Sequence, residues 1–292
     1  MITTHEFDVE GQHLVALCLN PEAVGEPIVL LPGFTTSVRM WLWPEVAFLQ
    51  EHGPCYSLSL PGHYPARFPP GFDWRLLTPE MVARVLTTAI HELLGDQQRF
   101  TLVGLSLGGT FALTVAGDCP EMVSRLVCVS GGVEGKKARG AVGLGMWLAR
   151  HGFLGRAIDK SILKTLGDPK GYPNAWRRLW GDPAAFDAWP GREAFLESSL
   201  ADTVHLDFDS LVLWHRSMNH GDIRNYLPRI TAPTLVLAGQ RDPLVPLDQA
   251  LLIAESVPKA ELVTFQDAGH IIPQECPEEF RGVVEGWLRK TG

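Results

Sequence analysis

A single serine stands between small residues in the stretch Gly104–Gly109, which reads Gly-Leu-Ser-Leu-Gly-Gly. The apolar run at 100–103 predicts a strand before it, and the run at 110–116 predicts a helix after it. At such a turn the serine takes a strained backbone conformation that exposes its hydroxyl, and small residues at 104 and 108 let strand and helix approach. Ser106 is therefore a candidate nucleophile, although the short pattern alone also fits an ordinary glycine-rich loop.

Two further residues have the types that would activate this serine. A serine hydroxyl is a poor nucleophile at neutral pH, so it needs a base within hydrogen-bond reach and a third group that orients the base. His270 and Asp242 each follow a predicted strand, at 260–265 and 232–239. Because functional loops gather at the carboxyl ends of parallel strands, we expect both side chains beside Ser106.

Other histidines and acids fit these roles less well. Asp267 lies too close to His270 in sequence, and Glu134 follows an earlier strand. The remaining candidate bases lack the strand-end context of His270, so we expect surface or packing roles for them; they are His63, His91, His151, His205, His215 and His220. Among these, His215 and His220 are the ones that could face the site from the middle of the chain.

The elements that must position these residues alternate along the chain. Strands are expected near 28–31, 55–60, 100–103, 126–130, 232–239 and 260–265, after an N-terminal hairpin or two edge strands within 3–19. Helices are expected at about 36–52, 79–94, 246–256 and 277–288. This alternation predicts βαβ units and a mostly parallel, doubly wound α/β sheet.

The alternation stops between residues 133 and 227. This segment is bulky and helical, and it holds five of the nine tryptophans. Prolines divide it into short helices, and long insertions in compact domains are usually functional. We therefore predict a core made of 1–132 and 228–292 with an inserted helical cap at 133–227; a bulky connection that only packs on the core is the alternative.

Composition excludes several classes of partner. With 292 residues, 46% of them hydrophobic and 20% charged, the chain is expected to be soluble and globular. The formal net charge of −8 argues against DNA, RNA or an anionic membrane surface as partner. No apolar stretch approaches the roughly 18 residues of a membrane helix, and the first residues do not resemble a secretion signal, so we expect a cytoplasmic protein.

These features together resemble the α/β-hydrolase superfamily. The resemblance rests on Leu31-Pro32-Gly33-Phe34, Leu60-Pro61-Gly62-His63, the turn around Ser106, the strand that ends in Gly239-Gln240-Arg241-Asp242, and Gly269-His270 followed by Glu275 and Pro277. The chain order serine, aspartate, histidine agrees with it. The resemblance covers nearly all of the chain apart from the cap. It implies an eight-stranded core, with Ser106 as nucleophile, His270 as general base and acid, and Asp242 as the carboxylate that orients His270.

An acyl-transfer transition state carries negative charge on oxygen, so two backbone N–H groups are expected to point at that oxygen. Leu107, directly after the serine, is one expected donor, and Phe34 is the other. The chain departs from many relatives here, with Pro32 where they have histidine and Ser59 where they often have aspartate. Backbone donation by Phe34 does not depend on either side chain.

The expected pocket is mainly apolar. We expect Phe34, Leu105, Leu107 and Ile271 to frame it together with the cap residues Trp147, Trp180 and Trp214, which favours a small hydrophobic acyl or aryl ester as substrate. Carbon–carbon bond hydrolysis of ring-fission products, lactonase, thioesterase and perhydrolase activity remain alternatives, as does a ligand-binding role without turnover. Neither a metal nor an organic cofactor is expected, because no metal-ligand spacing, zinc motif or phosphate-loop lysine is present.

Overall fold

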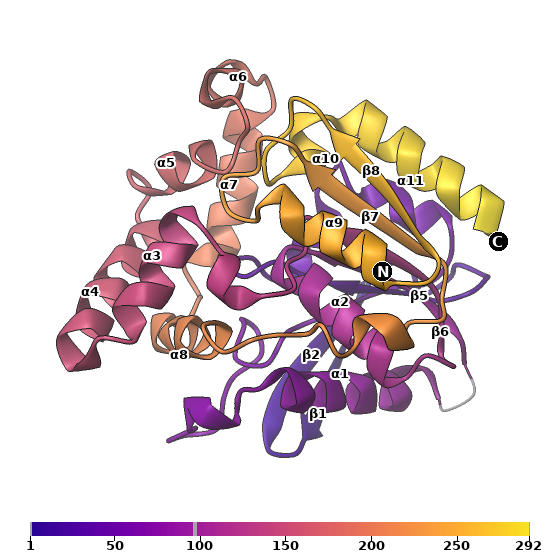
Figure 1. Ribbon diagram of the computed structural model, residues 1–292, viewed down its shortest axis with the longest axis horizontal. Helices are drawn as coiled ribbons and strands as arrows, with labels where there is room; N and C mark the ends of the chain where they lie inside the picture. The colour runs from indigo at the N-terminus through magenta and orange to yellow at the C-terminus, as the bar shows by residue number, and fades with distance from the viewer. Residues whose placement is uncertain (1, 96–97, 292) are drawn as a thin grey trace.

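A computed structural model describes residues 2–95 and 98–291, which form an eight-stranded sheet flanked by helices (Figure 1). The strands lie in the order β1-β2-β4-β3-β5-β6-β7-β8, and pairing is parallel from β4 to β8. The hairpin β1–β2 adds antiparallel strands at one edge. The strand bounds are β1 Thr3–Val9, β2 Gln12–Cys18, β3 Ile28–Leu31, β4 Cys55–Leu58, β5 Phe100–Leu105, β6 Val123–Val129, β7 Thr234–Gly239 and β8 Ala260–Phe265. The predicted α/β fold is confirmed.

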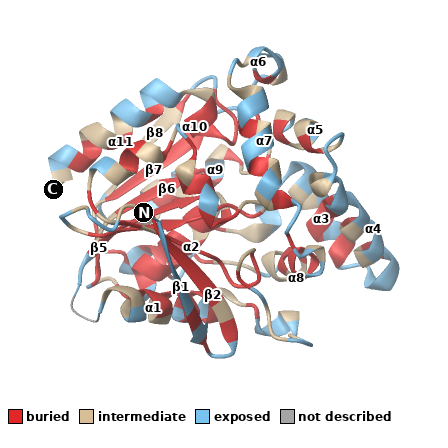
Figure 2. Cartoon of the chain, turned by 180° about the vertical axis from the view of Figure 1, so that it is seen from behind, coloured by how far each residue is buried: buried red, intermediate tan, exposed pale blue. Residues whose placement is uncertain are grey.

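Both faces of the sheet are covered, which explains the continuous apolar runs of its central strands. In β3, Val29 and Leu31 pack into the core on one face, whereas Ile28 and Leu30 pack into the core on the other. The first core includes the helices α1 (Pro79–Leu94), α2 (Leu107–Asp118) and α9 (Leu247–Ser256), and the second includes α11 (Pro277–Thr291). Figure 2 shows the buried sheet between these layers.

The prediction of one helix at 36–52 is wrong. Two separate 3₁₀ helices occupy this segment, η1 (Val38–Leu42) and η2 (Ala47–Glu51). Pro44 stands between them and has no backbone N–H to give to a preceding turn, so one continuous helix is broken there. The apolar side chains still reach the core, because Met40, Trp41 and Leu49 are each about 1% exposed.

Six α-helices separate β6 from β7 and lie within the 133–227 segment. They are α3 (Gly140–Ala149), α4 (Gly152–Lys164), α5 (Tyr172–Arg177), α6 (Pro183–Ala188), α7 (Arg192–Thr203) and α8 (Phe208–Met218). Proline stands in the first turn of α5 and α6, where its missing N–H costs no hydrogen bond. These helices form one side of the molecule, with α4 outermost (Figure 1). Over the described ranges, no helix is both long and apolar enough to cross a membrane.

Candidate active site

Ser106 lies at the turn between β5 and α2 in a backbone conformation that side chains rarely adopt. Its φ is 55° and its ψ is −117°. A Cβ atom at Gly104 would overlap the backbone carbonyl of Gly108, and one at Gly108 would overlap the carbonyl of Leu31. Glycine is therefore required at both positions, as predicted. The tight turn holds the serine at the carboxyl edge of the sheet, directly before the first turn of α2.

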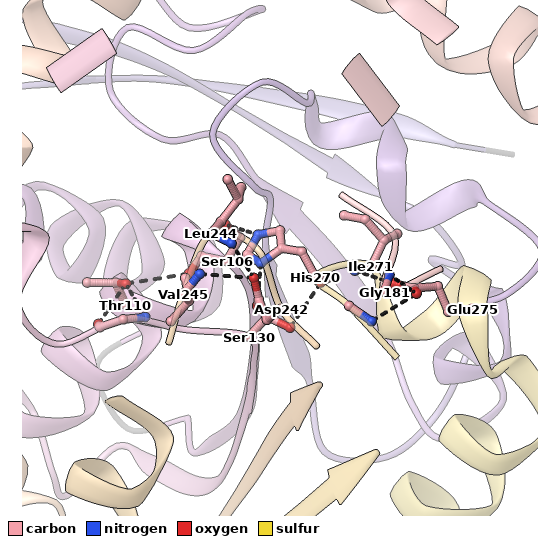
Figure 3. A network of polar contacts seen from close by, with 12 residues as sticks. Ser106, Thr110, Ser130, Gly181, Asp242, Leu244, Val245, His270, Ile271 and Glu275 are labelled. Atoms are coloured by element: carbon pink, nitrogen blue, oxygen red, sulfur yellow. Dashed lines mark hydrogen bonds and ion pairs between the residues drawn. The ribbon is translucent and has the colours of Figure 1, made fainter. Parts of the chain in front are cut away.

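Ser106, His270 and Asp242 form one chain of hydrogen bonds (Figure 3). The Ser106 hydroxyl lies 2.8 Å from Nε2 of His270, and Nδ1 of His270 lies 2.7 Å from Oδ2 of Asp242. When Nδ1–H donates to Asp242, Nε2 is free to accept the serine proton. The side chains of His270 and Asp242 are each 3% exposed, so water barely competes for this contact.

The loop after β7 holds the Asp242 carboxylate in place. Its second oxygen, Oδ1, accepts hydrogen bonds from the backbone N–H groups of Leu244 at 2.7 Å and Val245 at 2.9 Å. Asp242 is thus the acid that faces His270. Of the other two acids considered from the sequence, Asp267 pairs with Arg241 and Glu134 pairs with Lys136.

Glu275 connects the loop that carries His270 to the segment between α5 and α6 through hydrogen bonds. Its carboxylate accepts hydrogen bonds from the N–H groups of Gly269 at 2.8 Å, Ile271 at 3.1 Å and Gly181 at 2.7 Å. Burial raises the pKa of Glu275, while these three donors and nearby His270 act in the opposite direction. The sequence pattern included Glu275 without a role, and the structure identifies it as a support for the His270 backbone.

Two cavities meet at Ser106 and His270. The smaller has a volume of about 100 Å³, and its walls include Phe34, Leu107 and Trp214. The larger has a volume of about 640 Å³, and its walls include Phe34, Leu105 and Ile271. As the first residue of α2, Leu107 has a backbone N–H that the helix itself leaves without an acceptor. Phe34 and Leu107, whose N–H groups are the expected oxyanion donors, both line the smaller cavity together with Ser106.

Two of the three tryptophans predicted for the pocket lie elsewhere. Trp147 is 53% exposed on α3 and its ring contacts that of His151, whereas Trp180 is buried against Phe186 and Trp189. Neither is among the residues that line the two cavities. Helical spacing locates the helices of the 133–227 segment but does not say which face of each turns inward. The large cavity has other aromatic walls instead, formed by Trp43, Tyr172 and Trp176.

A second histidine–carboxylate pair lies in the wall of the large cavity. Nδ1 of His215 on α8 is 3.0 Å from both carboxylate oxygens of Asp159 on α4. The side chains are 3% and 0% exposed, and the His215 ring lies 4.9 Å from the ring of Phe34. The two residues are 56 positions apart, so their pairing could not be predicted from the sequence. It joins α4 to α8 above the loop that carries Phe34.

His63 lies fully buried beneath the same loop. Its ring packs edge-on against Phe34 and Trp214, and its Nδ1 is 3.3 Å from the carbonyl oxygen of Pro61. Burial lowers the pKa of His63 from 6.5 to about 4. The structure thus gives this residue the packing role expected from the sequence.

The lowered pKa of His63 predicts a loss of stability in mild acid. Between pH 6.5 and 4 only the unfolded chain takes up this proton, so the free energy of unfolding falls as the pH drops, by about 3 kcal/mol in total. Chemical denaturation at pH 7, 6, 5 and 4 measures this change. In His63→Asn, whose amide can still reach Pro61, the drop is expected to be about 3 kcal/mol smaller than in the wild type. Equal slopes in the two proteins would contradict the assignment.

A metal is not needed to explain the arrangement of these residues. Within residues 2–95 and 98–291, no group of three or more histidine, cysteine, aspartate or glutamate side chains has the geometry to hold a metal ion. The hydrogen-bonded series of hydroxyl, imidazole and carboxylate is instead an arrangement used for nucleophilic acyl transfer.

Curated proteins similar to this chain are bacterial and have several activities in their names. The chain is 26% identical to the carbamate hydrolase RutD of Pseudomonas savastanoi, covering 89% of this chain and 93% of RutD. It is 29% identical to a 2-hydroxy-6-oxononadienedioate/2-hydroxy-6-oxononatrienedioate hydrolase of Cupriavidus pinatubonensis, covering 72% and 68%. It is 25% identical to the dihydrolipoyllysine-residue acetyltransferase component of the acetoin cleaving system of Pseudomonas putida, but 91% of this chain spans only 64% of that protein.

Solved structures and a family model agree on the fold. The enol-lactonase of Burkholderia xenovorans superposes with a TM-score of 0.77 at 21% identity, covering 98% of this chain and all of the enzyme. The model of the alpha/beta hydrolase family matches residues 28–283, from the first parallel strand into the last helix. This chain belongs to the alpha/beta hydrolase family.

Proposed function

We propose that this hydrolase cleaves a hydrophobic carboxylic ester through an acyl intermediate on Ser106. The observation that carries the proposal is the unbroken hydrogen-bond series from Ser106 through His270 to Asp242, at the place where two cavities meet. In the first step the Ser106 oxygen attacks the ester carbonyl carbon while its proton passes to Nε2 of His270. The N–H groups of Phe34 and Leu107 then stabilise the oxyanion.

The same histidine completes the reaction. Collapse of the tetrahedral intermediate breaks the bond to the alcohol, which takes the proton from Nε2 of His270. Water then gives a proton to Nε2 and attacks the acyl carbon. The carboxylic acid leaves, and the proton returns to Ser106. Throughout both halves, Asp242 holds the imidazole in the required tautomer.

The unequal cavities support an ester with one small and one large apolar group. Ser106 and His270 belong to the walls of both cavities, so a scissile bond at the serine would direct its two substituents into different spaces. The volume of about 640 Å³ lies in the range of pockets that enclose a drug-sized ligand. Its aromatic and aliphatic walls favour an alkyl or aryl group over a charged one.

Esters of graded length test this proposal. From p-nitrophenyl acetate to the octanoate ester, kcat/KM is expected to rise, with each buried methylene contributing at most about 0.8 kcal/mol, or roughly fourfold. A lactone, a thioester, a carbamate and a ring-fission dienoate form the comparison set. Turnover of one of these without measurable ester hydrolysis would contradict the proposal.

Carbon–carbon bond hydrolysis is the second candidate, because the relative from Cupriavidus pinatubonensis is named as a hydrolase of 2-hydroxy-6-oxononadienedioate, a name that contains no ester. Such an enzyme would turn over the dienoate far faster than any ester. A protein that only binds its ligand would turn over none of the set.

A further inference from the structure

Large apolar side chains are exposed together on two neighbouring cap helices. Of the eleven large hydrophobic residues exposed in the described parts of the chain, six lie on α3 and α4. Phe153 is 80% exposed and Leu154 is 70% exposed, at the start of α4. The outer apolar face is formed by Leu144, Trp147, Phe153, Leu154, Ile158 and Ile162. Soluble proteins rarely leave such a group uncovered unless it binds something.

Three of these residues form a stripe along α4. Leu154, Ile158 and Ile162 recur every fourth residue, so they lie on the same face of α4. The buried Asp159 and Leu163 each follow one of these residues, so they lie about 100° further round the same helix. Figure 1 shows α4 as the outermost helix on its side of the molecule.

This outer apolar face reaches the entrance of the active site. Leu144 and Ile162 are 49% and 37% exposed, and both also belong to the wall of the 640 Å³ cavity. A molecule moving along the face would therefore pass from exposed apolar side chains into the cavity that ends at Ser106. The face is continuous with the site rather than remote from it.

The charge around the outer apolar face is opposite to that of the whole chain. The chain has a formal net charge of −8, yet the segment 139–164 contains five basic residues and one acidic residue. That acid, Asp159, is fully buried against His215, while Lys160 pairs with Asp209 on α8. The basic residues of the segment are Arg139, Arg150, Arg156, Lys160 and Lys164. Arg156, Lys160 and Lys164 lie on another face of α4 than Leu154, Ile158 and Ile162. An apolar face of tryptophan, phenylalanine and leucine combined with a polar face of lysine and arginine is typical of a helix that lies in a membrane interface.

We propose that α3 and α4 dock this hydrolase on an anionic lipid surface and that an ester dissolved in the lipid enters the large cavity from there. The charge argument based on the whole chain misses this face, because the segment 139–164 has an excess of basic residues although the whole chain is acidic. A second copy of the chain is a less suitable occupant, since a twofold contact would bring two basic rims together. Entry of a lipid-borne ester rests on the proposed function, whereas docking itself requires no turnover.

Vesicle flotation tests the docking step. The wild type is expected to float with phosphatidylcholine vesicles that contain phosphatidylglycerol, to float less with phosphatidylcholine alone, and to be released by high salt. The double variant F153S/L154S should bind anionic vesicles at least tenfold more weakly, because it removes the two most exposed apolar side chains of α4. The variant R150E/K164E reverses the charge of two basic residues in the same segment and keeps the apolar side chains. It should lose the preference for anionic lipid.

Matched controls separate docking from folding and from turnover. V24S/L251S removes exposed apolar side chains elsewhere and should bind vesicles like the wild type. F153S/L154S should keep its melting temperature and its rate on soluble p-nitrophenyl butyrate, while hydrolysis of p-nitrophenyl palmitate in anionic vesicles falls about tenfold. If no ester is hydrolysed but flotation behaves as expected, the proposed function fails and docking stands.

Three results would overturn the proposal. The first is a wild-type protein that does not float with anionic vesicles. The second is equal binding by the wild type and F153S/L154S. The third is a dimer in sedimentation velocity that F153S/L154S converts to a monomer, since this would make the outer apolar face an interface between copies of the chain.

Discussion

Ser106→Ala is expected to lower kcat by about 10⁵-fold or more while the protein stays folded. Removal of the hydroxyl leaves no atom to form the acyl intermediate, and the remaining rate comes from binding and from the oxyanion donors. The methyl group of alanine fits the space of the serine side chain, so the melting temperature should change little. Stopped-flow or steady-state hydrolysis of a p-nitrophenyl ester measures the loss.

The control for this variant is Ser198→Ala on α7, which removes an exposed serine hydroxyl far along the chain from the site. It should keep wild-type rates. Ester hydrolysis by Ser106→Ala at more than a few per cent of the wild-type rate, in protein free of wild-type contamination, would rule out Ser106 as the nucleophile.

Asp242→Asn is expected to lower kcat by about 10⁴-fold. The asparagine oxygen can still accept the hydrogen bonds from Leu244 and Val245, so the loop should keep its shape. Its NH₂ group would then face Nδ1 of His270, which must accept and therefore places the proton on Nε2. In that tautomer His270 cannot take the proton of Ser106. Initial rates with a saturating ester measure the effect.

Two matched variants show whether the effect belongs to Asp242. Asp267→Asn removes an exposed acid that pairs with Arg241 and should leave kcat unchanged. Glu134→Gln tests the other acid position considered from the sequence. A full rate in Asp242→Asn together with a collapse in Glu134→Gln would assign the orienting carboxylate to Glu134.

The core of the fold could be predicted because its signals are local. Ile28–Leu31 is apolar at every position, which indicates a strand covered on both sides, and Thr78 with Pro79 marks the start of α1. Ser106, Asp242 and His270 could be selected because each directly follows a strand. Parallel strands bring their carboxyl ends to one edge, so sequence position alone indicates proximity.

The walls of the large cavity could not be predicted in the same way. Which face of a helix in the 133–227 segment turns inward depends on how several short helices pack together, and no single helix encodes this. Trp147 on α3 and Trp176 on α5 have the same residue type and belong to the same segment, yet the first is half exposed and the second lines the cavity. His215 and Asp159 meet only because α8 packs on α4.

The contacts that hold His270 in place also depend on residues far apart in the sequence. Gly181 gives its N–H to Glu275 across 94 residues, and His270 gives its own N–H to the carbonyl of Leu179. These contacts connect the loop that carries His270 to the 133–227 segment, which also supplies walls of the large cavity. The sequence showed the glutamate but not its partner.

Reaction with a fluorophosphonate probe, followed by peptide mass spectrometry, tests the central claim most directly. The phosphonyl group bonds to an activated serine oxygen with loss of fluoride, so it reports the nucleophile without knowledge of the natural substrate. We expect one labelled peptide with the adduct on Ser106, no label in Ser106→Ala, and strongly slowed labelling in Asp242→Asn. Folded wild-type protein that carries no label, or carries it on another residue, would contradict the account.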